Sequence, residues 1–568
     1  MKATDFVLRS LAAHGVDHVF MFVGALIDPF LSAVCAGIVT PIVCANEAGA
    51  GYAADGYARA SRTFGAVLVI GGPGAFNTVG AMGAASADGV PLLLISGETA
   101  TAAQGRGSFQ DASPVGVEDL RVFDSLTGWS HIVPTPQALP QFLRDAYHGM
   151  LADRRRPVHI AMPTDVQEAE VGQPLWHPRA SLDPPRILDG EAFDRFGRDA
   201  LGQATRVAIL AGSGAIGSDA ADDLRVVAER LQIPVATTFR AKGVLPEDHP
   251  LSLGMFGYAG HPPAEDCLTS SDLDVLLVLG SSLNQRDTLD WNAHLRPRLG
   301  VASVNLCAAE LGRNFPVRHA ITGDVRTALR ALGDGPWTDA LRRTAKARRG
   351  WADEFLRRPR FLDADHLASD AVPIHPSRIV GELRKALPRD AALLIDSGAH
   401  RAFAGHYFSV YQPNRMFSAT GLGPMGWAVA ASVGVAVALS GTKIAVVTGD
   451  GCMLQNGMEI QTAARHRLDV LYVVFNNSAL GNVYLRARQM GEGPGRLCEL
   501  PTHDWAAFAT ALGVRGVRVD EPSQLAPAFA EFLERGGPML VDVRCDREAT
   551  TPIAPWADAV RHPDVFAE

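Results

Sequence analysis

The sequence lacks most of the features that would place a protein in a membrane, in an oxidising compartment or on nucleic acid. Its seven cysteines are scattered with no Cys-x-x-Cys pair, so we expect neither a zinc site nor a disulfide framework, and a reducing cytoplasm is the default. The net charge of −9 argues against a nucleic-acid partner. The longest stretch of low charge, Gly421 to Ser440, is interrupted by glycine and proline, which disfavours a membrane span.

The amino-terminal segment also lacks the pattern of a signal peptide, because Asp5 and Arg9 lie inside an amphipathic helical pattern. What the chain does have is 47% hydrophobic and 20% charged side chains, which is the balance of a soluble globular enzyme. Its 568 residues are too many for one hydrophobic core and should form about three or four domains.

Apolar strand-like segments alternate with helix-like segments along most of the chain, as in VFMFVG, PIVCAN, AVLVIGG and PLLLISG near the amino terminus. This alternation predicts doubly wound parallel sheets of the α/β class. A proline-rich linker at Leu182 to Pro185 and a charged helical connector at Asp339 to Arg358 divide the pattern. We therefore expect three α/β domains, at residues 1–170, 186–335 and 370–550.

The stretch from Ile444 to Gly481 carries the clearest chemical signal. An apolar strand ends at Gly449-Asp450-Gly451, and a second apolar strand ends at Asn476-Asn477. Open α/β sheets bind ligands at the carboxyl ends of their strands. Asp450 and Asn477 offer the hard oxygen ligands that suit a magnesium or calcium ion with a diphosphate as its other partner. The flanking glycines let the backbone approach phosphate closely.

By count, 24 residues separate Gly451 from Asn476, and a Gly-Asp-Gly followed at this distance by Asn-Asn resembles the diphosphate-anchoring motif of thiamine diphosphate (ThDP) enzymes. Three domains in this order resemble the acetolactate synthase branch of that family. The resemblance implies a pyrimidine-binding domain, a middle domain and a diphosphate-binding domain. The other segments that carry it are NEAGAGYAADGYAR around Glu47, Gly72-Pro73-Gly74, Phe109-Gln110-Asp111 and Gly423-Pro424-Met425-Gly426.

The resemblance also implies roles for individual residues. Taken alone, Glu47 could equally cap a helix, but in the family it is the catalytic glutamate that hydrogen-bonds the pyrimidine and promotes the carbanion of the thiazolium ring. Gln110 would reach the cofactor from the same domain. Asp450, Asn477 and the Ala479 carbonyl would bind Mg²⁺. The cofactor-binding residues would be Gly72, Pro73, Asn77, Gly423, Met425, Gly449, Gly451, Cys452, Asn477, Ala479 and Leu480.

The middle region contains a glycine pattern, Gly212 to Gly217, that follows a strand and opens a helix as a dinucleotide fingerprint does. In the resembling family this domain holds FAD, ADP or nothing. Asn305 and Cys307 stand where acidic residues are usual, which argues against FAD. The sequence leaves FAD, ADP and no cofactor open.

The substrate pocket departs from the resembling family. Asn482 and Arg486 replace the methionine and tryptophan that shape the acceptor pocket of acetolactate synthases. Leu26 stands where benzaldehyde-lyase-like relatives have a catalytic histidine, and Phe109 precedes Gln110 in the same domain. Arg286 matches an arginine that meets the carboxylate of the acceptor, with a structural salt bridge as the equal alternative. We expect a polar acceptor pocket with few acid-base groups, which suits carboligation.

These features support three functional hypotheses. The first is ThDP- and Mg-dependent decarboxylation of a 2-oxo acid, with transfer of the acyl carbanion to a carbonyl acceptor. The second is a 2-hydroxyacyl-CoA or acyloin-type C–C lyase, and the third is a non-catalytic binding subunit, which the presence of Glu47 and Asp450 disfavours. In the resembling family these two residues meet from different subunits, so we expect a homodimer or homotetramer.

Overall fold

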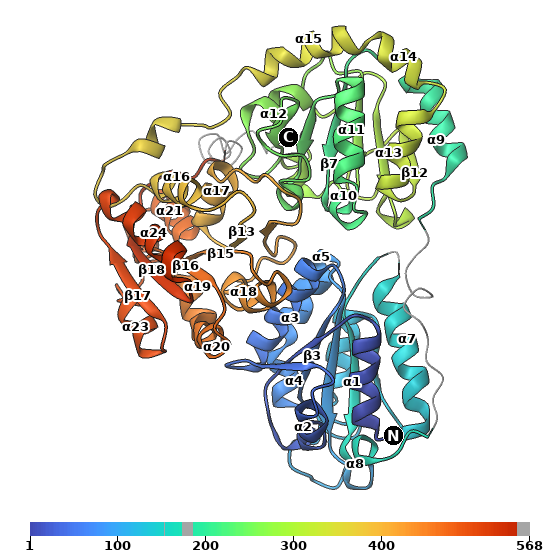
Figure 1. Ribbon diagram of the computed structural model, residues 1–568, viewed down its shortest axis with the longest axis vertical. Coiled ribbons are helices and arrows are strands. Elements are labelled where there is room, and N and C mark those ends of the chain that lie inside the picture. Colours follow the sequence, from blue (N-terminus) through green and yellow to red (C-terminus); the bar gives the residue numbers. More distant parts are fainter. Residues whose placement is uncertain (153, 173–185, 554–568) are drawn as a thin grey trace.

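The computed structural model describes residues 1–152, 154–172 and 186–553, so the predicted linker at residues 182–185 lies outside the described residues. Three six-stranded sheets form the cores of three domains, and every strand pairing within the sheets is parallel. Helices pack around each sheet (Figure 1). This confirms the predicted fold class. In the described ranges, no helix combines the length and the apolar character needed to cross a membrane.

The first sheet has the strand order β2-β1-β3-β4-β6-β5. Every residue of β4 is buried, as expected for a parallel strand covered on both faces. The strands are β1 (His18–Met21), β2 (Thr40–Val43), β3 (Gly65–Ile70), β4 (Leu92–Glu98), β5 (Ser130–Ile132) and β6 (Val158–Pro163). The helices are α1 (Ala3–Ala13), α2 (Asp28–Cys35), α3 (Glu47–Ser61), α4 (Pro73–Asn77), α5 (Val79–Asp88), α6 (Asp119–Thr127), α7 (Leu139–Leu151) and α8 (Thr164–Glu168).

The second sheet has the order β12-β11-β10-β7-β8-β9, which is the arrangement of dinucleotide-binding folds. Its strands are β7 (Val207–Ala211), β8 (Val235–Thr237), β9 (Ser252–Met255), β10 (Val275–Leu279), β11 (Val301–Asn305) and β12 (His319–Thr322). Its helices are α9 (Gly190–Phe196), α10 (Ser213–Gly217), α11 (Ala221–Leu231), α12 (Pro262–Leu268) and α13 (Val325–Asp334). The predicted charged connector forms α14 (Thr338–Arg343) and α15 (Ala345–Leu356).

The third sheet, β14-β13-β15-β16-β18-β17, repeats the strand order of the first. Its strands are β13 (Ala392–Ile395), β14 (Met416–Phe417), β15 (Ile444–Gly449), β16 (Val470–Asn476), β17 (Arg515–Val519) and β18 (Met539–Arg544). Its helices are α16 (Pro376–Ala386), α17 (Ala399–Tyr407), α18 (Trp427–Ala438), α19 (Asp450–Asn456), α20 (Ile460–Arg465), α21 (Gly481–Gln489), α22 (Glu492–Arg496), α23 (Trp505–Ala511) and α24 (Leu525–Arg535). The two outer domains therefore share one topology.

The first and third domains meet along the small-residue helices α3 and α18, which lie side by side (Figure 1). A side chain at Gly56 would collide with the Ala431 carbonyl, and one at Gly434 would collide with the Ala53 carbonyl. The absence of side chains at these glycines lets the two backbones touch. This packing fixes the helix that begins at Glu47 against the third domain of the same chain.

Asp88, at the end of α5, joins all three domains. Its carboxylate lies 2.9 Å from Arg59 of the first domain and 3.2 Å from Arg240 of the second, and it accepts a 2.9 Å hydrogen bond from Gly421 N–H of the third. Burial opposes ionisation of Asp88, but Arg240 and Arg59 outweigh burial and lower its pKa to about 2. The loop that leads to Gly423 and Met425 is thus anchored by a permanent charge.

Candidate active site

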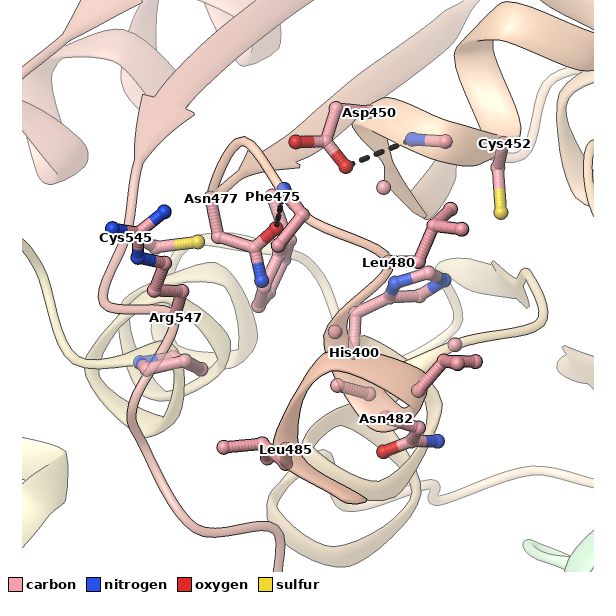
Figure 2. A pocket seen from close by; sticks show the side chains of 18 of the residues that line it. His400, Asp450, Cys452, Phe475, Asn477, Leu480, Asn482, Leu485, Cys545 and Arg547 are labelled. Carbon is pink, nitrogen blue, oxygen red and sulfur yellow. Dashed lines mark hydrogen bonds between the residues drawn. The ribbon is translucent and has the colours of Figure 1, made fainter. Parts of the chain in front are cut away.

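A pocket opens at the carboxyl ends of β13, β15, β16 and β18, where parallel sheets present their loops. Figure 2 shows Asp450 and Asn477 at one end of it and Asn482 and Leu485 at the other. The residues predicted from the sequence that line it are Met425, Gly449, Asp450, Gly451, Cys452, Asn477, Ala479, Leu480 and Asn482. The fold therefore gathers most of the predicted diphosphate and metal site in one place.

Asp450 is buried where β15 gives way to α19. Its Oδ1 accepts a 2.8 Å hydrogen bond from Gly451 N–H, while Oδ2 has no partner among the described residues. Burial raises the pKa of Asp450 to about 6, and the backbone N–H groups of Gly451 and then of residues 477–479 partly oppose this shift. A buried carboxylate oxygen without a partner is costly, so this atom is available to a cation.

The two adjacent asparagines have different surroundings. The Asn476 side chain donates to the His503 carbonyl at 2.9 Å and to Asp542 at 2.7 Å, so it fastens β16 to the chain around it. Asn477 is only half-buried, lines the pocket and accepts a 3.1 Å hydrogen bond from Ala479 N–H. Asn477 is therefore the one of the pair that is available to a ligand.

The donor set fits magnesium with a diphosphate. In the part of the chain that the structure describes, no three His, Cys, Asp or Glu side chains converge on a metal position. The oxygens at hand are one carboxylate at Asp450, one amide at Asn477 and backbone carbonyls. Mg²⁺ prefers such hard ligands and is usually completed by phosphate oxygens and water. These residues would hold the metal only together with a phosphate group.

The walls of the pocket require glycine at its turns. A side chain at Gly451 would come within 2.8 Å of Leu480 and 2.9 Å of Met425, and one at Gly449 within 3.0 Å of the His400 ring. His400 faces the pocket from α17 (Figure 2). Burial lowers its pKa to about 3, so the ring is neutral at neutral pH. His400 was not predicted from the sequence, in which its only distinguishing feature is its place just after an apolar strand.

Gly423 lies beside this pocket, not in its lining. Its φ of +69° favours glycine, and a side chain there would face Ser397 Oγ at 3.4 Å and Arg401 Nη1 at 3.8 Å. Arg401 is buried and donates to the carbonyls of Asp396 and Ala419. This arginine ties the turn after β13 to the segment that leads to Gly423.

Glu47, the first residue of α3, forms a second cluster in the first domain. It is 9% exposed, and Asn77 Nδ2 donates a 3.0 Å hydrogen bond to its Oε2. A side chain on Gly74 would come within 3.3 Å of Glu47 Oε1. Asn46 caps the helix by accepting from Gly49 N–H at 2.8 Å. Because Asn46 supplies the cap, the Glu47 carboxylate is left for another partner.

The other predicted residues of the first domain surround this cluster. Gly72 has φ +59° and Gln110 also has φ +59°, and a side chain on Gly72 would lie 3.8 Å from the Gln110 carbonyl. Phe109 is 84% exposed. Pro73 begins α4. Leu26 is half-buried, and its carbonyl accepts from Gln167 at 2.9 Å. An exposed phenylalanine beside a strained glutamine marks a loop tip that faces outward.

Glu459 is a further residue that sequence analysis missed. It is fully buried between the first and third domains, and its carboxylate accepts from the N–H groups of Ala45 (3.0 Å) and Asn46 (3.2 Å) and from Thr462 at 2.8 Å. Burial raises its pKa, and these bonds oppose the rise. Glu459 thus holds the turn that precedes Glu47. Its role could not be predicted from the sequence, because the contact joins residues that lie more than 400 positions apart.

We expect Glu459→Ala to lower the free energy of unfolding by about 2 kcal/mol, because two N–H groups of half-buried residues, Ala45 and Asn46, lose their acceptor. Chemical denaturation followed by circular dichroism measures this loss. Glu459→Gln keeps one acceptor oxygen and should lose less than Glu459→Ala. Equal stability of the alanine variant and the unmodified protein would contradict this account of the contact.

The two clusters do not meet within one chain. The residues that line the pocket all lie between positions 376 and 549, so Glu47 and Gln110 contribute nothing to it. Arg286, in the second domain, stacks on Tyr258 with its guanidinium carbon 4.3 Å from the ring centre, and no carboxylate of the described chain pairs with it. Arg486 is exposed on α21, the helix that carries Asn482.

The glycine pattern of the second domain forms a tight junction. A side chain at Gly214 would come within 2.7 Å of Gly280, so the turns after β7 and β10 touch. Asn305, at the end of β11, accepts a 3.0 Å bond from Cys307 N–H. Its side chain is therefore turned back onto its own backbone.

Comparison with known proteins places the same features in one family. The chain matches the family models "Thiamine pyrophosphate enzyme, N-terminal TPP binding domain" at residues 1–116, "central domain" at residues 198–332 and "C-terminal TPP binding domain" at residues 396–543. Thiamine pyrophosphate (TPP) is another name for ThDP. The first model spans Glu47, and the last spans Asp450 and Asn477.

Similar curated proteins extend over nearly the whole chain. Acetolactate synthase of Arthrospira platensis is 30% identical over 560 residues, covering 95% of this chain and 94% of that protein. The probable acetolactate synthase large subunit of Methanocaldococcus jannaschii is 29% identical over 575 residues, covering 98% and 94%. The acetolactate synthase isozyme 3 large subunit of Escherichia coli is 28% identical over 542 residues, covering 94% and 92%.

Proposed function

Because the chain belongs to the thiamine pyrophosphate enzyme family, we propose that it is a ThDP- and Mg-dependent enzyme that decarboxylates a 2-oxo acid and joins the acyl group to a carbonyl acceptor. The observation that carries this proposal is the partnerless buried oxygen of Asp450 beside Asn477. The names of the similar acetolactate synthases support the type of reaction. They do not fix its substrates.

In this proposal each cluster has a separate task. Asp450, Asn477 and the Ala479 carbonyl hold Mg²⁺ and with it the diphosphate, while Gly449, Gly451, Cys452 and Leu480 shape the space around them. Gly423 and Met425 bind the pyrimidine side, together with Gly72, Pro73 and Asn77. Bound ThDP supplies the chemistry of breaking and forming bonds next to a carbonyl carbon. Glu47, held by Asn77, holds and moves a proton on the pyrimidine.

The acceptor is where this chain departs from the enzymes it resembles. Asn482 lines the pocket beside the apolar Val483 and Leu485, and Arg486 lies one turn further along α21, outside the lining. Arg286, Phe109 and Leu26 would face the substrate from the other domains. The Asn482 amide favours an acceptor that offers a polar group to it over a simple alkyl ketone.

Incubation with ThDP, Mg²⁺ and a panel of 2-oxo acids, with and without aldehyde or ketone acceptors, tests the proposed reaction. Release of carbon dioxide together with a coupled product of the expected mass supports carboligation. Carbon dioxide without a coupled product would make the protein a simple decarboxylase. ThDP binding without turnover of any donor would favour a binding subunit.

We also infer a homo-oligomer whose active sites lie between subunits, because Glu47 and Asp450 sit in separate clusters of one chain. Co-expression of a Glu47→Gln chain with an Asp450→Ala chain tests this. In a mixed dimer one site combines the intact Glu47 of one subunit with the intact Asp450 of the other. Random pairing should restore about a quarter of normal activity. No activity above that of the single variants would contradict shared sites.

For the middle domain, which we place at residues 186–335, we propose that no flavin is bound. The turned-back Asn305 side chain and the close contact between Gly214 and Gly280 support this. We expect the absorption spectrum of the purified protein to lack flavin bands. Calorimetry with added ADP tests separately whether this domain binds that nucleotide. A stoichiometric flavin spectrum would overturn the expectation.

A further inference from the structure

The second domain contains a cavity of about 680 Å³, which we call the second-domain cavity. None of the predicted site residues is part of its lining. Gly300 precedes β11 and Arg318 precedes β12, so the cavity lies at the amino ends of these two strands. The Gly212 to Gly217 pattern follows the carboxyl end of β7, where a dinucleotide would bind. The cavity is therefore separate from that position.

The size and the apolar surface of the cavity suit a small organic molecule. Pockets for small ligands measure about 300 to 1,000 Å³ and combine an apolar lining with a few polar groups. Leu295 and Phe315, which are both buried, supply apolar surface. Trp291 lines the same cavity and is 52% exposed. Its indole offers a flat surface on which a ring can pack.

The charged groups of the cavity are all positive. Arg296 and Arg318 line it, and none of the described residues in its lining is acidic. Within the described ranges neither guanidinium has a carboxylate partner, whereas the nearby Arg313, outside the lining, pairs with Glu310 at 3.2 Å. Two guanidinium groups without a counter-charge, next to an apolar surface, favour an anion such as a carboxylate or a phosphate.

Gly300 makes room for Arg318. Its φ of +100° favours glycine, and a side chain there would come within 2.6 Å of Arg318 Cβ and 2.7 Å of Arg318 Cδ. The Arg318 N–H donates to the Val301 carbonyl at 2.9 Å, which fixes the backbone at this edge of the cavity. The aliphatic stem of Arg318 therefore has a defined course over the Gly300 turn.

Two asparagines of the lining join and complete the walls. Asn314 Nδ2 donates to the Ser282 carbonyl and to Asn284 Oδ1, both at 2.9 Å, so the segment before β12 is tied to the segment after β10. Asn292 Oδ1 accepts from His294 N–H at 2.8 Å. This bond leaves the Asn292 amide nitrogen to donate to a ligand.

The wall that carries Trp291 has an uncommon backbone. The three residues 289–291 have φ values of +52°, +58° and +57°, a left-handed run that residues other than glycine rarely adopt. The Trp291 N–H donates to Thr288 Oγ1 at 3.1 Å, and Thr288 is fully buried and ends the short turn that carries Arg286. Backbone strain of this kind is concentrated at binding sites.

We propose that the second-domain cavity binds a small organic anion, whose planar ring packs on Trp291 and whose carboxylate or phosphate meets Arg296 and Arg318. The inference goes beyond the proposed reaction, because none of these residues belongs to the clusters around Glu47 and Asp450. A nucleoside monophosphate and an aromatic carboxylate share the required chemistry. They serve as the two probes that distinguish the sources of the anion.

Calorimetric titration with adenosine monophosphate and with indole-3-propionate, on the full-length protein with and without ThDP and Mg²⁺, tests the proposal. At least one probe should bind with a Kd below about 1 mM, and ThDP should not displace it. Arg318→Gln should weaken that binding about tenfold or more, because it removes a charged donor. Arg313→Gln is the matched control and should bind as the unmodified protein does. Absence of binding by both probes, displacement by ThDP, or equal affinities of the two variants overturns the proposal.

Hydrogen–deuterium exchange locates the bound probe without any assay of activity. Peptides that cover residues 286–297 and 312–319 should exchange more slowly with the probe present, and peptides that cover residues 208–218 should not change. Protection confined to residues 208–218 would place the probe at the dinucleotide end of the sheet and overturn the proposal. Sedimentation tests whether a second copy of the chain covers the cavity instead. A change of oligomeric state in Arg318→Gln, without binding of either probe, would show this and also overturn the proposal.

Discussion

Replacement of Glu47 with glutamine is expected to abolish turnover while ThDP still binds. Glutamine has almost the same shape and can keep the contact with Asn77, which is 3.0 Å long in the structure. It cannot hold or release a proton at the position of the carboxylate. Loss of a positioned acid-base group costs about 10²- to 10⁴-fold in rate. Steady-state kinetics with the best donor of the panel and calorimetry with ThDP and Mg²⁺ measure the two effects separately.

Glu191→Gln is a suitable control for this substitution. Glu191 lies in the first turn of α9 and its side chain is 83% exposed, so the same chemical change occurs at a helix start with no role in the site. Its kinetics should match those of the unmodified protein. If Glu47→Gln kept more than about a tenth of the activity, the carboxylate would be a helix-end charge and not the acid-base group.

The fold could be predicted from the sequence because its signals are local. Strands such as Val470–Asn476 are largely apolar runs, every residue of which is buried, and this strand ends at a pair of asparagines. That pattern belongs to parallel sheets covered on both faces. The shared topology of the outer domains was visible only as a common rhythm. Strand order depends on pairings between distant segments, such as β13 with β15, which no local pattern encodes.

The site residues also differ in whether a local sequence pattern marks them. Asp450 and Asn477 were found because two adjacent strands end at a fixed spacing, and the pocket brings them together. His400 and Glu459 were not found, because a lone histidine or carboxylate in a helical segment has no distinctive neighbours in the sequence. Their importance comes from burial and from contacts such as Glu459 with Ala45. The roles of the predicted site residues remain proposals that the variants must test.

The metal site gives the second prediction with a large expected effect. Asp450→Asn should weaken binding of ThDP in the presence of Mg²⁺ by about 100-fold or more, since even residues that only support metal ligands are worth 10- to 100-fold in affinity. The substitution removes the charge that the partnerless Oδ2 would present to the cation. Isothermal titration of ThDP at several Mg²⁺ concentrations measures the loss. Chelation of Mg²⁺ should reduce binding by the unmodified protein to the same level.

A folding defect can be separated from this loss, because Asp450→Asn is expected to leave the cofactor-free protein at least as stable. An amide in place of a buried, unpaired carboxylate reduces the cost of burial, and the Gly451 N–H keeps its acceptor. Saturating ThDP and Mg²⁺ should stabilise the unmodified protein by about 2.7 kcal/mol at a hundred times Kd, and the variant hardly at all. Asp520→Asn, at an exposed carboxylate paired with Arg518, is the control. Equal stabilisation of Asp450→Asn and the control would show that the carboxylate does not carry the metal.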